Sequence, residues 1–219
     1  MIINISHQKG GVGKSTIAFN LAVSLGNGFK IEVIDLDVQN TITHTNKIRK
    51  ENGYKKLKIK YINNEKELKE YIELDSDEKI TIIDSGGFDS SLNRLAIFYS
   101  DMVITPVSDR FNEISGLMKY IEILQELNKI TGEDIKVNVL LNNINPKVKN
   151  FDGLKTFIKK NSEFKLLDSV LRQRADYDKS AWKGCSVKEY NKESKATAEF
   201  SSLVKEIKKK LGVKNGKKN

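Results

Sequence analysis

The stretch HQKGGVGKSTIAFNLA, residues 7–22, determines the fold class expected of this chain. It follows the apolar segment 1–6 and leads into segment 15–27, whose apolar residues recur at intervals of three and four, as in an amphipathic helix. A strand, a glycine-rich loop and a helix in this order are typical of a phosphate-binding loop, G-x-x-x-x-G-K-[ST]. The chain departs from that pattern in two places. Gln8 replaces the first glycine, and Lys9 is an additional lysine.

The chemistry of this loop follows from its residue types. Glycines let backbone N–H groups turn inward and approach phosphate oxygens, and the helix that starts near Lys14 adds its positive N-terminal end. Lys14 is expected to reach the β- and γ-phosphates, and the Ser15 hydroxyl to ligate Mg²⁺. A glycine-rich turn without a ligand is the alternative, but eight consecutive residues fit the motif in the right context. The loop residues expected to bind the phosphates of a nucleotide are Gly10, Gly11, Val12, Gly13, Lys14, Ser15 and Thr16.

The rest of the chain alternates between strand-like and helix-like segments. The segments that read as further buried strands are 30–37, 57–62, 79–85, 101–107 and 134–142. The segments with helical apolar spacing are 64–74, 91–100 and 113–131, and, after Pro146, the mostly helical 151–161, 173–184 and 196–213. This alternation predicts an α/β fold, a mainly parallel twisted sheet with helices on both faces. We expect a single domain over residues 1–212 and a frayed basic tail over 213–219.

Acidic residues stand at the ends of two predicted strands. Asp84 ends an apolar strand, where its carboxylate can hold Mg²⁺ through water. Asp35 and Asp37 lie two residues apart, so they share one side of an extended strand. A carboxylate there can position the water that attacks a γ-phosphate. Carboxyl ends of parallel strands are where such sheets bind ligands.

Charge is unevenly distributed along the chain. Residues 146–219 hold 20 Lys and Arg against 9 Asp and Glu, whereas residues 1–145 hold 18 against 20. The basic last third would suit nucleic acid, an anionic membrane surface or an acidic partner, or it is simply a solvated face. The single cysteine, Cys185, cannot form an internal disulfide, and we expect it buried in a reducing cytoplasm. The start of the chain does not read as a secretory signal.

The segment KGGVGKST, residues 9–16, resembles the deviant Walker A motif of the ParA/MinD group of ATPases. The resemblance implies that Lys9 reaches across a dimer interface to phosphates bound by the partner subunit, so that Mg·ATP holds a sandwich homodimer together. IDLDVQN, residues 34–40, is similar to the ParA-type partition motif, with Val38 in place of a proline. The resemblance implies that Asp37 is catalytic, with Asp35 in support and Asp37 also a candidate water-mediated Mg²⁺ contact.

Further resemblance extends along the chain. LLNNINP, residues 140–146, is similar to the region in which an asparagine recognises adenine, which points to Asn142. DSGG, residues 84–87, departs from the family pattern after its aspartate. The last third resembles the region with which ParA relatives bind DNA without sequence preference, and the implied phosphate contacts are Arg172, Arg174 and Lys195.

The resemblance therefore implies a weak, partner-stimulated ATPase for plasmid or chromosome partition, with a ParB-like centromere-binding protein as partner. The expected location is cytoplasmic and nucleoid-associated. Because the first strand opens the chain, it resembles the short form without an N-terminal helix-turn-helix domain.

Several alternatives remain at this point. The main one is a MinD-like membrane-associated positioning ATPase, for which the apolar stripe of 200–211 would be the membrane anchor; we expect that stripe to pack on the sheet instead, and expect no membrane partner. One cysteine argues against an iron–sulfur carrier, and the absence of N-K-x-D argues against a GTPase. Lys9 argues against a small-molecule kinase. A non-hydrolysing scaffold is disfavoured by Asp37 and Asp84.

Overall fold

The computed structural model describes residues 1–73 and 79–213, except for the side chains of Phe111 and Asn112. Its strands form a seven-stranded sheet in the order β3-β2-β4-β1-β5-β6-β7, and every described pair of neighbours is parallel. The strands are β1 Ile2–Ile5, β2 Lys30–Asp35, β3 Lys58–Tyr61, β4 Lys79–Asp84, β5 Met102–Val107, β6 Val137–Ile144 and β7 Phe164–Arg172. The expected α/β fold with a parallel sheet is confirmed.

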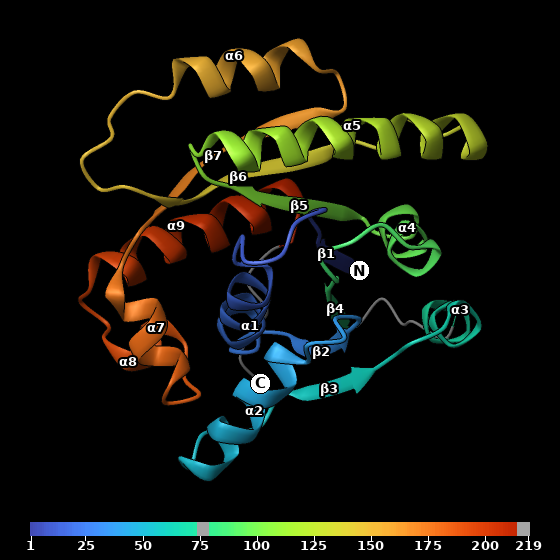
Figure 1. The fold of residues 1–219 in the computed structure, drawn as a ribbon. Helices are drawn as coiled ribbons and strands as arrows, with labels where there is room; N and C mark the ends of the chain where they lie inside the picture. The colour runs from blue at the N-terminus through green and yellow to red at the C-terminus, as the bar shows by residue number, and fades with distance from the viewer. Residues whose placement is uncertain (74–78, 214–219) are drawn as a thin grey trace.

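Helices cover both faces of this sheet (Figure 1). They are α1 Lys14–Leu25, α2 Thr41–Glu51, α3 Glu65–Glu73, α4 Ser91–Phe98, α5 Phe111–Thr131, α6 Asp152–Lys160, α7 Ala175–Ala181, α8 Val187–Tyr190 and α9 Lys195–Lys210. Alternate strand residues face opposite sides. Ile3 and Ile5 of β1 therefore pack in the cluster that contains α1 and α9, whereas Ile2 packs in the cluster with α3 and α4.

A further core cluster joins α5 and α6 to β5 and β6. It contains Leu117 and Tyr120 of α5 and Leu154 of α6, packed on Val103 and Val139. The three clusters are continuous with the one sheet, which is the arrangement expected of a single domain. The boundary expected at residue 212 remains a prediction, because residues 214–219 of the expected tail lie outside the described residues.

Three elements were not predicted from the sequence: strand β7, helix α2 and the four-residue helix α8. Strand β7 was missed because Phe164, Leu167 and Leu171, its buried apolar residues, recur at intervals of three and four, as in a helix. Phe164 packs in the cluster of α5 and α6, whereas Leu167 and Leu171 pack in the cluster of α1 and α9, so the spacing arises because β7 buries residues on both faces of the sheet. Helix α2 was missed because two of its three buried residues, Asn46 and Arg49, are polar.

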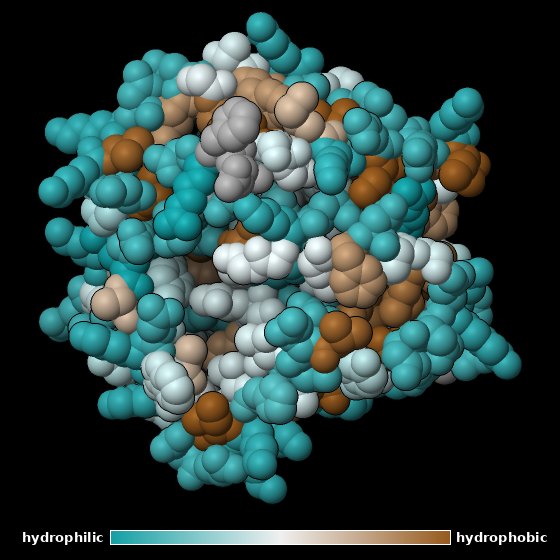
Figure 2. All heavy atoms as spheres, viewed as in Figure 1, coloured by the Kyte–Doolittle hydropathy of each residue, from teal (hydrophilic) through white to brown (hydrophobic). Residues whose placement is uncertain are grey.

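The apolar stripe of α9 packs on the sheet, as expected. Phe200, Leu203 and Ile207 are buried in the same cluster as α1 and the strands β1, β2 and β4. Among the described residues, no helix is long and apolar enough to cross a membrane. Hydrophilic residues cover most of the face seen in Figure 2, with hydrophobic residues in small separate groups.

Candidate functional site

The glycine-rich loop connects β1 to α1 at the carboxyl edge of the sheet. Gly11 and Gly13 have φ angles of 78° and 95°, in the left-handed region that favours glycine. Gly13 is the N-cap of α1, and a Cβ there would lie 2.6 Å from Nδ2 of Asn142. Two of the glycines are therefore required by backbone conformation, and one of them also by the close approach of β6.

Lys14 is the first residue of α1, and its side chain lies inside the loop. It is 4% exposed, and its Nζ donates a hydrogen bond to the carbonyl oxygen of Lys9 at 3.1 Å. Burial lowers the pKa of Lys14, and the nearby carboxylates of Asp84 and Asp37 oppose that shift. The cation is thus held at the centre of the loop and faces two acidic residues.

The backbone of Lys9 is fixed by a histidine that sequence reasoning did not select. The N–H of Lys9 donates to Nδ1 of His7 at 3.0 Å, and His7 is fully buried. Burial, with the charges of Lys14 and Lys9, lowers the pKa of His7 to about 4, so the ring is neutral and can accept this bond. A Cβ at Gly116 of α5 would lie 2.9 Å from the ring, so the histidine is tightly enclosed. A histidine in the turn directly after a buried strand was the available signal.

Asp84 ends β4 and pairs in register with Ile5 of β1 and Asp35 of β2. Its carboxylate is fully buried, and neither oxygen has a hydrogen-bond partner among the described residues. Burial raises the pKa of Asp84 to about 7, an effect that the nearby Ser15 hydroxyl and Lys14 partly offset. A buried carboxylate without a partner is costly, and this one lies beside a lysine and a serine hydroxyl. The arrangement fits a site that a divalent cation and its waters complete.

The described residues contain no group of three His, Cys, Asp or Glu side chains able to hold a metal ion by themselves. This agrees with the way in which Mg²⁺ is bound at phosphate loops, where it keeps several waters and takes few protein ligands besides the phosphates. Ser15 and Asp84 would be the protein groups that face the ion.

Asp35 is engaged in holding the loop that follows β2. It is fully buried, and its carboxylate accepts from the Thr43 hydroxyl at 2.6 Å and from the N–H of Asp37 at 3.2 Å. Burial raises its pKa. These contacts tie the start of α2 to the end of β2, so Asp35 positions Asp37. A direct catalytic role for Asp35 remains untested.

Asp37 lies on the wall of a cavity of about 510 Å³ together with the loop. Its carboxylate accepts from the N–H of Gln39 at 3.0 Å and is half-buried. The residues that line the cavity are Gly10, Gly11, Gly13, Lys14, Ser15, Thr16, Asp37, Val38, Gln39, Thr41, Gly87 and Phe88. The structure thus brings the loop, its lysine and serine, and the predicted catalytic aspartate to one cavity.

Gly87 shows why the DSGG segment has its second glycine. A Cβ at this position would lie 2.8 Å from the backbone nitrogen of Gly10 and 3.1 Å from the carbonyl carbon of Lys9. The segment after β4 therefore packs directly on the backbone of the phosphate-binding loop. No larger residue fits there without moving that loop.

Asn142 lies at the other side of the loop, where its Nδ2 donates to the carbonyl oxygen of Val12 at 2.8 Å. It lines a second cavity of about 280 Å³, which shares Gly11, Gly13 and Thr16 with the first cavity. A nucleotide that spans the two would place its phosphates in the larger cavity and its base beside Asn142. Adenine recognition by Asn142 remains a prediction.

The three residues expected to contact DNA are in different environments. Arg172 and Arg174 line the second cavity, and both guanidinium groups are bonded within the chain. Arg172 donates to the carbonyl oxygen of Val148 at 2.8 Å, and Arg174 forms an ion pair with Glu199 at 2.6 Å. Lys195, at the start of α9, is exposed. Their role in DNA binding remains a prediction, but the two arginines lie beside the nucleotide cavity instead of on an outer surface.

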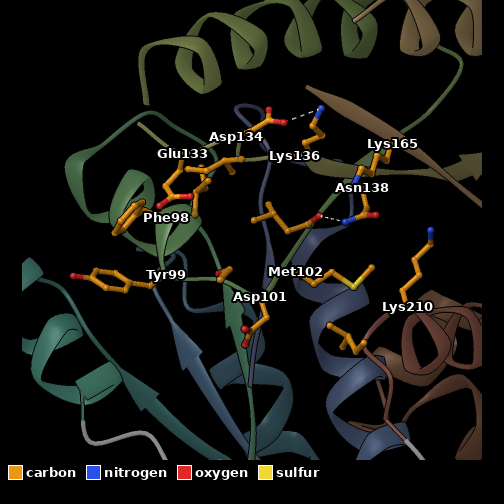
Figure 3. Close-up of a pocket in the computed structure, with 15 residues that line it drawn as sticks. Phe98, Tyr99, Asp101, Met102, Glu133, Asp134, Lys136, Asn138, Lys165 and Lys210 are labelled. Carbon is orange, nitrogen blue, oxygen red and sulfur yellow. Dashed lines mark hydrogen bonds and ion pairs between the residues drawn. The ribbon is translucent and has the colours of Figure 1, made fainter. Parts of the chain in front are cut away.

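A larger cleft, of about 880 Å³, lies at the amino ends of β5, β6 and β7. Figure 3 shows Lys165 and Lys210 on one side of this cleft and Phe98 and Tyr99 on the other. Asp101, on its wall, accepts from the N–H of Ile2 at 2.7 Å and so has a structural task. Parallel α/β sheets bind ligands at the carboxyl ends of their strands, so we assign the nucleotide site to the opposite edge.

Comparison with known proteins agrees with this assignment. Residues 1–86 match the AAA_31 family model, described as an AAA domain. That range includes the loop, Asp37 and Asp84. McdA from Cyanothece, in a complex with ATP, superposes with a TM-score of 0.75 over 99% of this chain and 98% of its own, at 17% identity. The chain has the fold of the ParA/MinD-type P-loop ATPases.

Two other solved structures share this fold. MinD from Pyrococcus horikoshii, a septum site-determining protein complexed with Mg-ADP, gives a TM-score of 0.72 at 19% identity over 96% of this chain and 97% of its own. A plasmid partition protein from Borrelia burgdorferi bound to AMPPNP gives 0.69 at 18% identity over 95% and 98%. An uncharacterized protein of Methanocaldococcus jannaschii is 55% identical over 40 residues, which are 18% of this chain and 15% of that protein. These neighbours include both partition proteins and MinD, so the fold alone does not distinguish the two roles.

Proposed function

We propose that this protein is an Mg²⁺-dependent ATPase that dimerises around ATP and binds DNA without sequence preference, as a partition protein does. The observation that carries the ATPase assignment is the buried carboxylate of Asp84. Neither of its oxygens has a hydrogen-bond partner in the described part of the chain, and the carboxylate lies beside Lys14 and Ser15 in the phosphate-binding loop. The nucleotides named in the neighbouring structures, ATP, AMPPNP and Mg-ADP, support the same chemistry.

Each residue of the site has a separate role in hydrolysis. The loop N–H groups and Lys14 bind the β- and γ-phosphates, and α1 adds its positive N-terminal end. Ser15 and Asp84 would hold Mg²⁺, which would supply positive charge to offset that of the phosphates. Asp37 orients the attacking water at the mouth of the cavity. Asp35 keeps Asp37 in place, because its carboxylate accepts a hydrogen bond from the backbone N–H of Asp37.

The homodimer part of the proposal rests on Lys9. Its backbone is fixed on both sides, since its N–H bonds to His7 and its carbonyl oxygen to Lys14. Its side chain is half-buried and is not among the residues that line the phosphate cavity. A cation held at this edge is suited to reach the γ-phosphate of a second subunit, where it would offset the charge of two enclosed triphosphates.

DNA is favoured over a membrane as the second partner. The stripe of α9 that a MinD-like anchor would use is buried against the sheet, with Leu203 and Ile207 fully covered. The last third keeps its excess of lysine and arginine, which suits a polyanion. A ParB-like centromere-binding protein would stimulate hydrolysis, and the protein would act in the cytoplasm on the nucleoid.

The test compares the protein in Mg·ATP and in Mg·ADP on two surfaces, random-sequence DNA and anionic liposomes. An Asp37→Ala variant retains ATP, and Asp134→Ala, an exposed substitution far from the cavity, is its matched control. Retention on DNA with ATP, falling steeply with salt, supports the proposal. Retention on liposomes alone would replace it with a membrane-positioning role. An Asp37→Ala variant that hydrolyses ATP at the rate of the control would exclude Asp37 as the catalytic residue.

A further inference from the structure

Two segments that are far apart in the sequence meet around one buried arginine. Arg49 of α2 is 4% exposed, and its guanidinium group forms two hydrogen bonds of 2.8 Å with Glu189. The same group donates to the carbonyl oxygens of Lys55, at 2.6 Å, and Gly184, at 3.2 Å. Arg49 therefore fastens residues 47–56 to residues 179–190.

The packing at this junction is very close. Gly184 has a φ of 61°, and a Cβ there would lie 2.1 Å from the backbone nitrogen of Arg49. The guanidinium carbon lies 5.2 Å from the centroid of the Tyr54 ring and 5.8 Å from that of Phe19. A buried arginine that is bonded to both segments in this way fixes their relative position, although Glu189 itself is partly exposed.

The outer side of both segments is rich in lysine. We call this exposed face, formed by residues 47–56 and 179–190, the lysine surface. Its acidic residues are Glu51 and Glu189, and Glu189 is occupied by Arg49. Its exposed lysines, which form no ion pair within the described part of the chain, are Lys47, Lys50, Lys55, Lys56, Lys179, Lys183 and Lys188. Figure 1 shows α2 beside α7 and α8, and Figure 2 shows a largely hydrophilic surface around the lower end of α2.

One large aromatic residue stands among these lysines. Trp182, directly after α7, is 82% exposed. Among the described residues of these two segments, no other large hydrophobic side chain is exposed. The face therefore lacks the contiguous apolar patch that a membrane or the apolar surface of another protein would bind. A tryptophan ring can lie against a sugar or a base, and its indole N–H can donate to a phosphate.

We infer that the lysine surface is the DNA-binding face of this protein, with its lysines on backbone phosphates and Trp182 against the sugars. The inference rests on the DNA binding proposed above and changes its location. The residues that face DNA are those around the junction at Arg49. Four of the lysines on this surface come from the first third of the chain. Double-stranded DNA carries one charge per ~1.7 Å along its axis, and such a spread of unpaired lysines matches a polyanion better than a compact acidic site.

Helix α2 also gives this surface a physical connection to the nucleotide cavity. Thr41, its first residue, lines that cavity, and Thr43 bonds to Asp35. The helix extends for about 16 Å from there to Glu51 on the lysine surface. A change in the cavity that moves the start of α2 therefore also moves the lysines at its end.

The experiment measures binding of a fluorescent random-sequence duplex by anisotropy, across a salt series, in Mg·ATP and in Mg·ADP. The test variant combines Lys50→Gln, Lys55→Gln and Lys56→Gln. Its matched control combines Lys155→Gln, Lys159→Gln and Lys160→Gln, which removes three exposed lysines from the last third, on α6. Trp182→Ala is measured alone, since so exposed a side chain is not needed for folding. ATP hydrolysis without DNA is expected to be unchanged in all three.

We expect the test variant to reduce the slope of log K against log salt by about 3, with the control close to wild type. We expect Trp182→Ala to weaken binding about tenfold with an unchanged slope, because the indole carries no charge and releases no counterions. If wild type binds DNA in ATP but the test and control variants bind equally well, or equally poorly, the lysine surface is excluded and the proposed function stands. If wild type binds no DNA in ATP, both the surface and the DNA role are excluded.

Discussion

Replacing Asp84 by asparagine is expected to stabilise the free protein at pH 8 while abolishing ATP hydrolysis. The pKa of Asp84 rises from 3.8 to about 7 on folding, because its carboxylate is fully buried. Between those two pH values the folded protein holds a proton that the unfolded chain has released, so stability falls as pH rises. The loss is complete above about pH 7 and amounts to about 4 kcal/mol.

The asparagine variant has no ionisable group at this position, so its free energy of unfolding does not fall over this pH range. A buried amide without partners itself costs about 1–3 kcal/mol, and the net gain at pH 8 is therefore about 2 kcal/mol. At pH 5 wild-type Asp84 is protonated when folded, so the difference should vanish or change sign. The same change removes the carboxylate that faces Mg²⁺, so hydrolysis should be lost and Mg·ATP should no longer stabilise the protein.

Urea unfolding of the nucleotide-free protein at pH 5 and pH 8 measures both differences, with hydrolysis followed in parallel. Asp134→Asn is the matched control, since that carboxylate is 77% exposed and its loss should be nearly neutral at both pH values. A difference in unfolding free energy between variant and wild type that is the same at pH 5 and pH 8 would refute the argument from burial. Retained hydrolysis would refute the role at the Mg²⁺ site.

Three further predictions concern the residues that hold the loop and α2. Gly87→Ala places a Cβ 2.8 Å from the backbone nitrogen of Gly10, so the phosphate-binding loop must move. ATP affinity, measured by titration calorimetry, should fall about tenfold, a loss of about 1.4 kcal/mol. Unchanged affinity would show that the loop can move at no cost. The pKa of His7 is lowered from 6.5 to about 4, so on acidification the unfolded chain is protonated first and about 3 kcal/mol of stability is lost between those pH values. His7→Gln removes this loss and leaves the opposite slope of Asp84, so the stability of the variant relative to wild type should rise by about 3 kcal/mol between pH 6.5 and pH 4; a difference between the two that does not change with pH would contradict it. Glu189→Gln leaves the buried charge of Arg49 partly unpaired, which should cost about 3 kcal/mol in urea unfolding, whereas Glu193→Gln, at an exposed site, should cost almost nothing.

The sequence was sufficient to predict the fold class and the residues of the phosphate-binding loop. Its six expected strands correspond to β1–β6, and five of them are short apolar runs that are largely buried in the sheet. The sixth, β3, was expected to be buried but is an edge strand whose residues are mostly exposed. The loop could be predicted because backbone geometry restricts it: Gly11 and Gly13 have positive φ angles. Asp84 and Asp37 were predicted because the strands are parallel, which brings their carboxyl ends together.

Two of the three missed elements, α2 and β7, have a common physical cause. The apolar pattern predicts an element only when its buried residues are apolar and recur with the period of one face. In α2 the buried Asn46 exchanges two hydrogen bonds with the backbone of Leu57, and Arg49 is paired with Glu189. In β7 the buried residues are divided between the two faces of the sheet, with Phe164 on one face and Leu167 and Leu171 on the other. Hydrogen bonds and packing of this kind depend on partners that are distant in the sequence, so the local pattern does not reveal them.

What the sequence determined by itself was local chemistry: which loop binds phosphate, which carboxylates end strands, and that the last third is basic. Only the tertiary structure decided how these groups are used. It buried His7 and paired Arg174 with Glu199, and it left the buried oxygens of Asp84 without hydrogen-bond partners over the ranges 1–73 and 79–213. It also joined lysines of the first third to Trp182 through Arg49. Burial and pairing are properties of residues brought together from distant parts of the chain, and they set both the charge state of an ionisable group and its freedom to meet a ligand.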